Sequence, residues 1–219
     1  MDATQKTAAI ILAAGSSSRM GAGRHKLLLP LADRPVLVHV IDATLASQAR
    51  PIIIVLGHQA KEVRAHLAPY FEHLNIIITE NPDYLQGMST SMHMGLRTLM
   101  ANKETSSASM VDSALIMLGD QPLITPQMID TLVTTWRIIG LRIVAPLYDG
   151  KRGNPVLFDA SLFAELLATT GDEGGRSVIE RHRQELAAVE VSDPVANYDV
   201  DTWEAYQRLL QAWEDKMNN

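Results

Sequence analysis

Four short runs of apolar residues, each followed by a segment with helical spacing, constrain the fold of this chain most strongly. The runs carry Ile, Val and Leu at successive positions, so both of their faces are apolar. Such strands are typical of a parallel sheet that helices cover on both sides. The expected strands are Ala8–Ala14, Pro51–Gly57, Asn75–Thr79 and Ser113–Leu118, and the expected helices cover 35–48, 59–69, 88–102 and 125–139.

The strand–helix alternation predicts an α/β fold with right-handed crossovers. After residue 140 the pattern changes, and 141–148 with Pro155–Phe158 predicts a hairpin or an irregular strand pair around the turn Asp149-Gly150. A late strand at 186–191 and an amphipathic last helix follow. We therefore expect a three-layer sandwich with a mostly parallel, mixed sheet. Because 219 residues suit one large domain, we expect a single domain over 1–219.

Composition excludes several classes of partner and chemistry. The formal net charge of −6 argues against duplex nucleic acid, which needs a basic protein face. The sequence has no cysteine, which excludes disulfides, thiolate metal sites and a cysteine nucleophile and fits a cytoplasmic protein. It has no long uncharged apolar run, so we expect neither a signal peptide nor a membrane span. A serine-rich stretch at 103–109 is too short for a domain linker.

The first expected strand ends in a loop of small residues that suits a polyphosphate. Between Gly15 and Gly21 stand three serines and Arg19, and Lys26 follows. Glycines let backbone N–H groups approach anionic oxygens, and the two cations supply fixed positive charge. The spacing matches neither a Walker A loop nor a dinucleotide fingerprint. The alternative is a plain loop with solvated basic side chains.

Acidic residues are expected at the same edge of the sheet. Asp120 directly follows the fourth strand, and ligands of open parallel sheets bind at the carboxyl ends of strands. Asp199 and Asp201 alternate just before the last helix, so both carboxylates lie on one side of an extended stretch. Carboxylates there could hold Mg²⁺ against phosphate oxygens. The alternatives are an ordinary turn at Asp120 and a helix N-cap at Asp201, with Glu204 three residues on.

Three further loops carry candidate binding residues. In the segment 81–91, Gly87 would let a nucleobase stack on backbone, and Gln86, Ser89 or Ser91 could contact base or ribose, or the serines could cap the next helix. The loops 150–155 and 171–176 present glycine and basic groups, which suit either an anionic second substrate or a hairpin turn and a helix cap.

Taken in order, these segments resemble the molybdopterin nucleotidyltransferases, the MobA-like NTP transferases of the wider Rossmann-like, GT-A-like nucleotidyltransferase fold. The members that use CTP are most similar. The matching segments are Leu12-Ala13-Ala14-Gly15 to Arg19-Met20-Gly21 and Lys26, Gly87-Met88-Ser89 to Ser91, Gly119-Asp120-Gln121-Pro122, Arg152-Gly153-Asn154-Pro155, Gly171-Asp172 to Gly175-Arg176, and Asp199-Val200-Asp201-Thr202. The sequence departs from the family in a slightly long Gly21-to-Lys26 spacing and in Trp203, where proline is usual.

The resemblance implies Mg²⁺-dependent transfer of CMP from CTP to the terminal phosphate of molybdopterin, with Ala13-Ala14 favouring CTP. It implies catalytic roles for Arg19, Lys26 and Asp120, and a magnesium site at Asp120 and Asp201. The implied nucleotide-binding residues are Leu12, Ala13, Ala14, Gly15, Arg19, Lys26, Gln86, Gly87 and Ser89, and the implied acceptor-binding residues are Arg152, Asn154, Asp172 and Arg176.

The implied partners are CTP, molybdopterin and a molybdenum hydroxylase apoenzyme, without nucleic acid or membrane. Two other activities stay open at this point. One is a cytidylyl- or guanylyltransferase of isoprenoid or sugar-phosphate metabolism. The other is a non-catalytic carrier of molybdenum cofactor for a xanthine-dehydrogenase-type enzyme.

Overall fold

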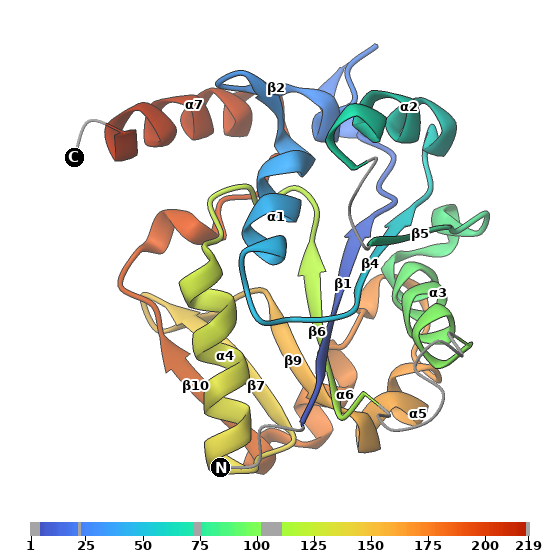
Figure 1. The fold of residues 1–219 in the computed structure, drawn as a ribbon, viewed down its shortest axis with the longest axis vertical. Coiled ribbons are helices and arrows are strands. Elements are labelled where there is room, and N and C mark those ends of the chain that lie inside the picture. Colours follow the sequence, from blue (N-terminus) through green and yellow to red (C-terminus); the bar gives the residue numbers. More distant parts are fainter. Residues whose placement is uncertain (1–4, 22, 72–75, 102–110, 218–219) are drawn as a thin grey trace.

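A mixed, mostly parallel sheet forms the centre of the molecule, with helices on both faces (Figure 1). The computed structural model describes residues 5–21, 23–71, 76–101 and 111–217. The expected strand start at Asn75 and the serine-rich stretch 103–109 lie outside these ranges. The α/β class that the sequence predicts is confirmed.

The eight strands are ordered β10-β7-β9-β6-β1-β4-β5, and β8 pairs with β7. The four strands that the sequence placed first are parallel neighbours, whereas β9 runs antiparallel between β6 and β7. The turn Asp149-Gly150 joins β7 to β8, and the segment predicted to pair with 141–148 forms β9, which is antiparallel to β7. The strands are β1 Thr7–Ala13, β4 Ile52–Leu56, β5 Ile76–Glu80, β6 Ser113–Leu118, β7 Ile143–Tyr148, β8 Lys151–Arg152, β9 Val156–Asp159 and β10 Leu186–Glu190, with a separate small pair β2 Pro30–Leu31 and β3 Arg34–Pro35.

The helices divide into two layers, and a last helix packs apart from them. Side chains of α1, α2 and α4 form one buried cluster with one face of the sheet, and those of α3, α5 and α6 form a second cluster with the other face. The described α-helices are α1 Val36–Leu45, α2 Ala60–Phe71, α3 Met88–Ala101, α4 Pro126–Ile139, α5 Phe163–Leu166, α6 Arg176–Arg181 and α7 Trp203–Met217.

Strand β1 shows why the apolar runs specify this arrangement. Ile10 points to the α3 side and Ile11 to the α1 side, and both are fully buried. Each such side chain contributes about 1.5–3 kcal/mol when it is removed from water. Strand β5 differs from the prediction, because it is an edge strand whose residues are only half-buried or exposed.

Helix α7 packs on the segment that follows the first loop. Tyr206 is buried against Leu31 and Met20, while Trp203 and Trp213 are partly buried around them. The apolar stripe predicted for this helix is therefore a packing surface. None of the described helices is long and apolar enough to cross a bilayer.

Helix capping partly follows the sequence. Thr125 accepts a hydrogen bond from the Met128 N–H (3.3 Å) and Pro126 opens α4, as expected. The N-cap proposed at Asp201 is wrong, because Thr202 Oγ1 accepts the bond from the Ala205 N–H at 3.1 Å. The Asp201 side chain is thereby left for other contacts.

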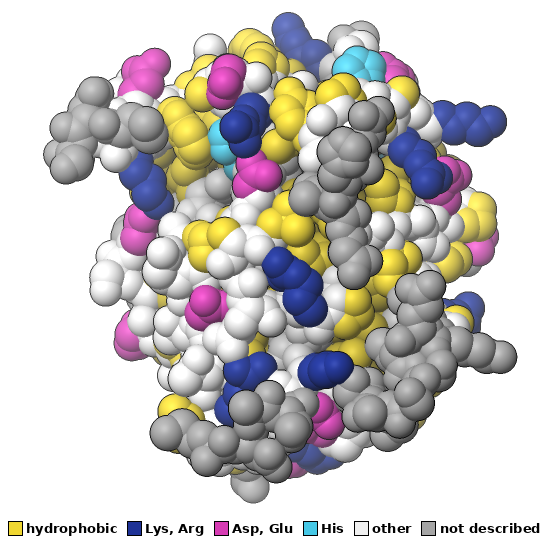
Figure 2. Space-filling model, viewed as in Figure 1, with side chains coloured by type: hydrophobic (Ala, Val, Ile, Leu, Met, Phe, Trp, Pro, Cys, Tyr) yellow, Lys and Arg dark blue, Asp and Glu magenta, His cyan; other side chains and the backbone are white. Residues whose placement is uncertain are grey.

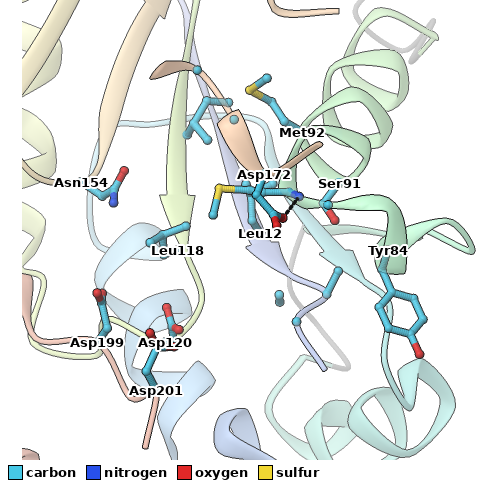
Figure 3. A pocket seen from close by; sticks show the side chains of 18 of the residues that line it. Leu12, Tyr84, Ser91, Met92, Leu118, Asp120, Asn154, Asp172, Asp199 and Asp201 are labelled. Atoms are coloured by element: carbon cyan, nitrogen blue, oxygen red, sulfur yellow. Dashed lines mark hydrogen bonds between the residues drawn. The ribbon is translucent and has the colours of Figure 1, made fainter. Parts of the chain in front are cut away.

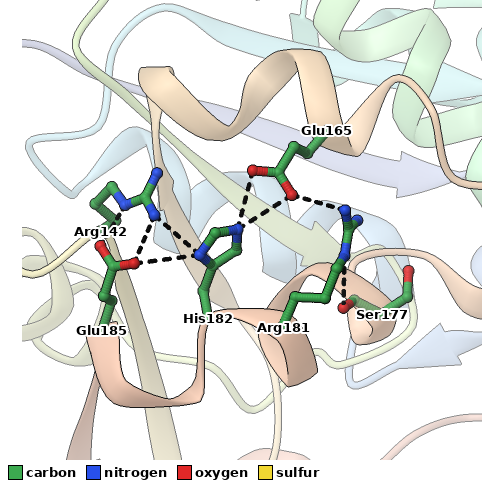
Figure 4. Close-up of polar contacts among 6 residues, drawn as sticks. All are labelled: Arg142, Glu165, Ser177, Arg181, His182 and Glu185. Carbon is green, nitrogen blue, oxygen red and sulfur yellow. Dashed lines mark hydrogen bonds and ion pairs between the residues drawn. The ribbon is translucent and has the colours of Figure 1, made fainter.

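An ionic network fixes the end of α6 that lies away from the first loop (Figure 4). His182 contacts Glu165 of α5 over 2.9 Å, and Arg181 contacts the same carboxylate over 2.8 Å. Arg142, just before β7, holds Glu185, and its hydrogen bond lowers the pKa of that carboxyl to about 2. These contacts tie α6 to both α5 and the sheet.

On the face seen in Figure 2, basic and acidic side chains are interspersed. The described residues of this face form no continuous basic stripe. A mixed surface of this kind agrees with the formal net charge of −6.

Candidate active site

A cavity of about 690 Å³ lies at the carboxyl edge of the sheet. Backbone hydrogen bonds join the loops that follow neighbouring central strands, so these loops lie side by side at this edge. The Gly119 N–H donates to the Leu12 carbonyl (2.9 Å), and the His58 N–H donates to the Ala14 carbonyl (3.1 Å). Loops that are far apart in the sequence therefore open into the same space.

The first loop folds back so that Lys26 enters the cavity. The Lys26 N–H donates to Ser17 Oγ (3.1 Å), and the next residue, Leu27, is buried in the core. These two contacts fix the backbone on either side of the lysine. The slightly long spacing after Gly21 is accommodated in this way, and Lys26 lines the cavity together with Gly15.

The second acidic segment is attached to the first by one backbone hydrogen bond. The Val200 N–H donates to the Asp120 carbonyl (3.1 Å), and the Val200 side chain is fully buried. Because side chains alternate along extended backbone, Asp199 and Asp201 then flank Val200 on the opposite side. Figure 3 shows Asp120, Asp199 and Asp201 together at one end of the cavity.

Lys26 lies between two of these carboxylates. Its Nζ donates to Asp120 Oδ2 and, over 2.9 Å, to Asp201 Oδ1. Arg19 Nη2 contacts the other oxygen of Asp201 at 3.1 Å, although its side chain is 68% exposed. The first loop and both acidic segments thus meet at a single ionic cluster.

The pKa values of this cluster follow from burial and charge. Burial alone would lower the pKa of Lys26, but the charges of Asp120 and Asp201 outweigh it and raise that pKa. Burial would raise the pKa of Asp201, but its bonds to Lys26 and Arg19 lower it. Burial and the charge of Asp120 raise the pKa of Asp199 to about 6, although the hydrogen bond from Gln121 acts in the opposite direction.

Asp120 and Asp201 fit a magnesium ion by the chemistry of their donors. Mg²⁺ usually takes one or two carboxylates together with water and substrate phosphates. No group of three or more His, Cys, Asp or Glu side chains within the described ranges is arranged to hold a metal alone. Two carboxylates beside a loop suited to phosphate would therefore need the nucleotide to complete the coordination.

Gln121 is a site residue to which the sequence analysis gave no role. Its side chain is almost fully buried and donates to Asp199 Oδ1 (2.6 Å) and Asn197 Oδ1 (3.3 Å). Gln121 thus positions the segment that carries the acidic pair. In the sequence, its position directly after Asp120 is the signal that could have identified Gln121 as a site residue.

At the other end of the cavity, two loops are joined by contacts that we call the Gly87–Asp172 clasp. It consists of Gly87, Met88, Gly171 and Asp172. The Met88 N–H donates to Asp172 Oδ1 (3.0 Å), so Asp172 caps α3 in place of the serines considered above. Gly87 has φ +113°, and a Cβ atom built on it would overlap the Gly171 carbonyl group and lie 2.8 Å from its Cα. Only glycine fits there.

Most of the residues implied by the family resemblance line the cavity. Gln86 and Ser89 do not: Gln86 donates to Asp83 Oδ1 (2.9 Å), and the buried Ser89 hydroxyl has no hydrogen-bond partner within the described residues. The implied residues that line it are Leu12, Ala13, Ala14, Gly15, Arg19, Lys26, Gly87, Asp120, Arg152, Asn154, Asp172, Arg176 and Asp201.

An apolar wall completes the cavity opposite the ionic cluster. Its side chains come from α3, β6, β9 and α6, so no sequence motif groups them. Met88 is partly exposed at this wall, while Phe158 is buried behind Gly175. The wall is formed by Met88, Met92, Ile116, Val156, Phe158 and Ile179.

Comparisons with known proteins identify the family to which this α/β fold belongs. Residues 9–186 match the MobA-like NTP transferase domain. The chain therefore belongs to the MobA-like NTP transferase family.

Individual relatives extend this assignment. The chain is 30% identical to the Nicotine blue oxidoreductase of Paenarthrobacter nicotinovorans, over 92% of this chain and 95% of that protein. It is 29% identical to the Molybdenum cofactor cytidylyltransferase of Escherichia coli, over 88% and 90%. The crystal structure of Rv0371c from Mycobacterium tuberculosis is 29% identical, with a TM-score of 0.77 over 96% of this chain and all of that one. A structure of Rv0371c in complex with manganese also matches, with a TM-score of 0.71 at 27% identity over 95% of this chain and all of that one.

Proposed function

We propose that this protein transfers CMP from CTP to the terminal phosphate of molybdopterin and releases pyrophosphate. The observation that carries the proposal is the cluster of Lys26, Asp120 and Asp201 beside the Gly15 loop. It brings a cation suited to phosphate and two carboxylates suited to a metal ion together in one cavity. The similarity to the cytidylyltransferase of Escherichia coli supports the choice of substrates.

In the proposed reaction, a phosphate oxygen of the acceptor attacks the α-phosphorus of CTP. The bond to the β-phosphate oxygen breaks, and pyrophosphate leaves with the electron pair. Positioning and charge stabilisation are sufficient for such a reaction, so no protein nucleophile is needed. Lys26 and Arg19 would bind the triphosphate and stabilise the departing charge. Asp120 and Asp201 would hold Mg²⁺, which supplies Lewis-acid stabilisation of phosphate oxygens when it is bound.

The two ends of the cavity suit the two substrates. Ala13 and Ala14 line the cavity beside Gly15, and the family resemblance implies that the cytosine nucleotide binds there. At the other end, Arg152 and Arg176 are exposed cations next to the apolar wall. A phosphorylated heterocycle such as molybdopterin has both an anionic and an apolar part. Asn154 also lines the cavity (Figure 3).

We further propose that the chain acts as a single domain in the cytoplasm and delivers its product to a molybdenum hydroxylase apoenzyme. The absence of cysteine suits a reducing compartment. Incubation with each nucleoside triphosphate and molybdopterin, followed by mass analysis, tests the substrates. The proposed product is the CMP ester of molybdopterin.

The decisive variant is Asp120→Ala, which should abolish pyrophosphate release from CTP while the protein stays folded. Asp130→Ala is the matched control, because Asp130 is an α4 residue that accepts a bond from the Gln48 N–H (2.8 Å). The control should keep full activity. Normal turnover by Asp120→Ala would refute the proposed function.

A different activity has a distinct outcome in the same assays. The relative named Nicotine blue oxidoreductase makes a redox activity the second candidate. That candidate predicts no pyrophosphate with any nucleotide and reduction of a dye by a hydride donor. A carrier of molybdenum cofactor would show no thermal stabilisation by any nucleotide with Mg²⁺. Transfer to an isoprenoid or sugar phosphate would identify the other nucleotidyltransferases.

A further inference from the structure

Lys26 occupies the space between the two carboxylates that we assign to the metal ion. Its Nζ contacts Asp120 Oδ2 and Asp201 Oδ1 together. The side chains of Lys26 and Asp120 are only 14% and 13% exposed, so solvent screens their contact weakly. A magnesium ion bound by the same two oxygens would lie about 2.0–2.1 Å from each of them. That position overlaps the one taken by Nζ.

We infer that Lys26 is an ionic placeholder, which fills the metal position until a metal–triphosphate complex displaces it. The inference rests on the proposed use of Asp120 and Asp201 as metal ligands. The ammonium group and a divalent cation cannot share these oxygens, because like charges a few ångströms apart repel strongly in a half-buried site. Free metal must therefore bind weakly, whereas metal and nucleotide strengthen each other's binding.

The first loop lies within reach of the Lys26 side chain. A Cβ atom built on Gly15 would lie 3.8 Å from Lys26 Cε, so the lysine side chain passes directly along the first loop. The Lys26 backbone is held by Ser17. Rotation about the outer side-chain bonds can thus carry Nζ from the carboxylates toward the loop without a backbone movement. A triphosphate on that loop would supply the negative charge that replaces the lost contacts.

Lys26 cannot leave without a replacement charge. Arg19 contacts Asp201 Oδ2, which is not the oxygen that Lys26 contacts, and the Arg19 side chain is largely exposed. Without Lys26, Asp120 Oδ2 and Asp201 Oδ1 would lose their ion pairs, and an unpaired charge is costly at Asp120, whose side chain is only 13% exposed. Departure of the lysine and arrival of the metal are therefore one exchange. Lys26, which we propose binds phosphate, would therefore also make metal binding depend on bound nucleotide.

The test is Mn²⁺ binding to the nucleotide-free, full-length protein, measured by electron paramagnetic resonance. Lys26→Met should bind Mn²⁺ at least tenfold more tightly than the wild type. Lys26→Arg keeps the charge and should bind as weakly as the wild type. Lys151→Met is the matched control for net charge, because Lys151 is exposed on β8 and makes no ion pair within the described residues. It should leave the affinity unchanged.

Two results would overturn the inference. One is a Lys26→Met protein that binds Mn²⁺ no more tightly than the wild type. The other is an equal gain in Lys151→Met, which would assign the effect to net charge. Should Lys26→Met not fold, NMR of wild-type protein labelled with ¹³C at lysine Cε decides, since Mg²⁺ saturation must shift the Lys26 signal. Metal binding that leaves this signal unmoved contradicts the inference. Neither measurement requires nucleotidyl transfer. The inference about Lys26 can therefore fail while the proposed function holds, and the proposed function can fail while the inference about Lys26 holds.

Discussion

Substitution of Gly87 tests whether the Gly87–Asp172 clasp contributes to stability and to the nucleotide site. In Gly87→Ala, the new Cβ atom would overlap the carbonyl group of Gly171, and these backbone atoms cannot turn aside as the end of a flexible side chain could. Alanine would also have to adopt φ +113°, a region that is almost restricted to glycine. The two loops must therefore separate, or the backbone of Gly87 must change.

The expected loss combines two contributions. The backbone conformation costs alanine about 1–3 kcal/mol. Separation of the loops would also lose the Met88 N–H bond to the Asp172 carboxylate, of a type worth about 1.5–3 kcal/mol when desolvated and less at this exposed position. We expect a total of about 3 kcal/mol, against a free energy of unfolding of about 5–15 kcal/mol for a typical protein.

The assay is urea unfolding of Gly87→Ala beside Gly140→Ala. Gly140 has φ +70° but no atom within 4 Å of a built Cβ, so its substitution reports backbone strain alone, about 1–2 kcal/mol. Gly87→Ala should cost about 1–2 kcal/mol more than the control and should also weaken CTP binding. Equal losses in the two variants would refute the role of the Gly171 contact.

The remaining predictions concern packing and pH. In Gly95→Ala, the added Cβ would overlap Ile10 Cγ2 and lie 3.2 Å from Val55 Cγ2, so thermal unfolding should show a loss of about 1–3 kcal/mol despite the better helix former. A folded-state pKa of about 6 for Asp199, above its ordinary 3.8, means that the folded protein binds this proton more tightly than the unfolded chain. The Asp199 contribution to stability should therefore rise as pH falls from 6 to 4, so the free energy of unfolding of the wild type minus that of Asp199→Asn, measured with urea, should increase over this range. The same pH dependence in both proteins would contradict the assignment.

Sequence determined the fold class because its signals are local. The apolar runs around Ile10 and Ile116 specify strands that are buried on both faces, and helical spacing specifies the covering layers. It also placed Gly15 and Asp120 at one edge, because parallel strands end at the same side of a sheet. Residue type and position in an element were sufficient for these predictions.

Tertiary structure decided which side chains meet. The contact of Lys26 with Asp120 and Asp201 depends on Ser17 and on the backbone bond from Val200, which no spacing in the sequence reveals. Asp172, which the family resemblance placed at the acceptor, is also the cap of α3, because strand order brings segments 84 residues apart into contact. Such contacts arise from the packing of distant elements, whereas local periodicity and capping preferences report only on neighbours in the chain.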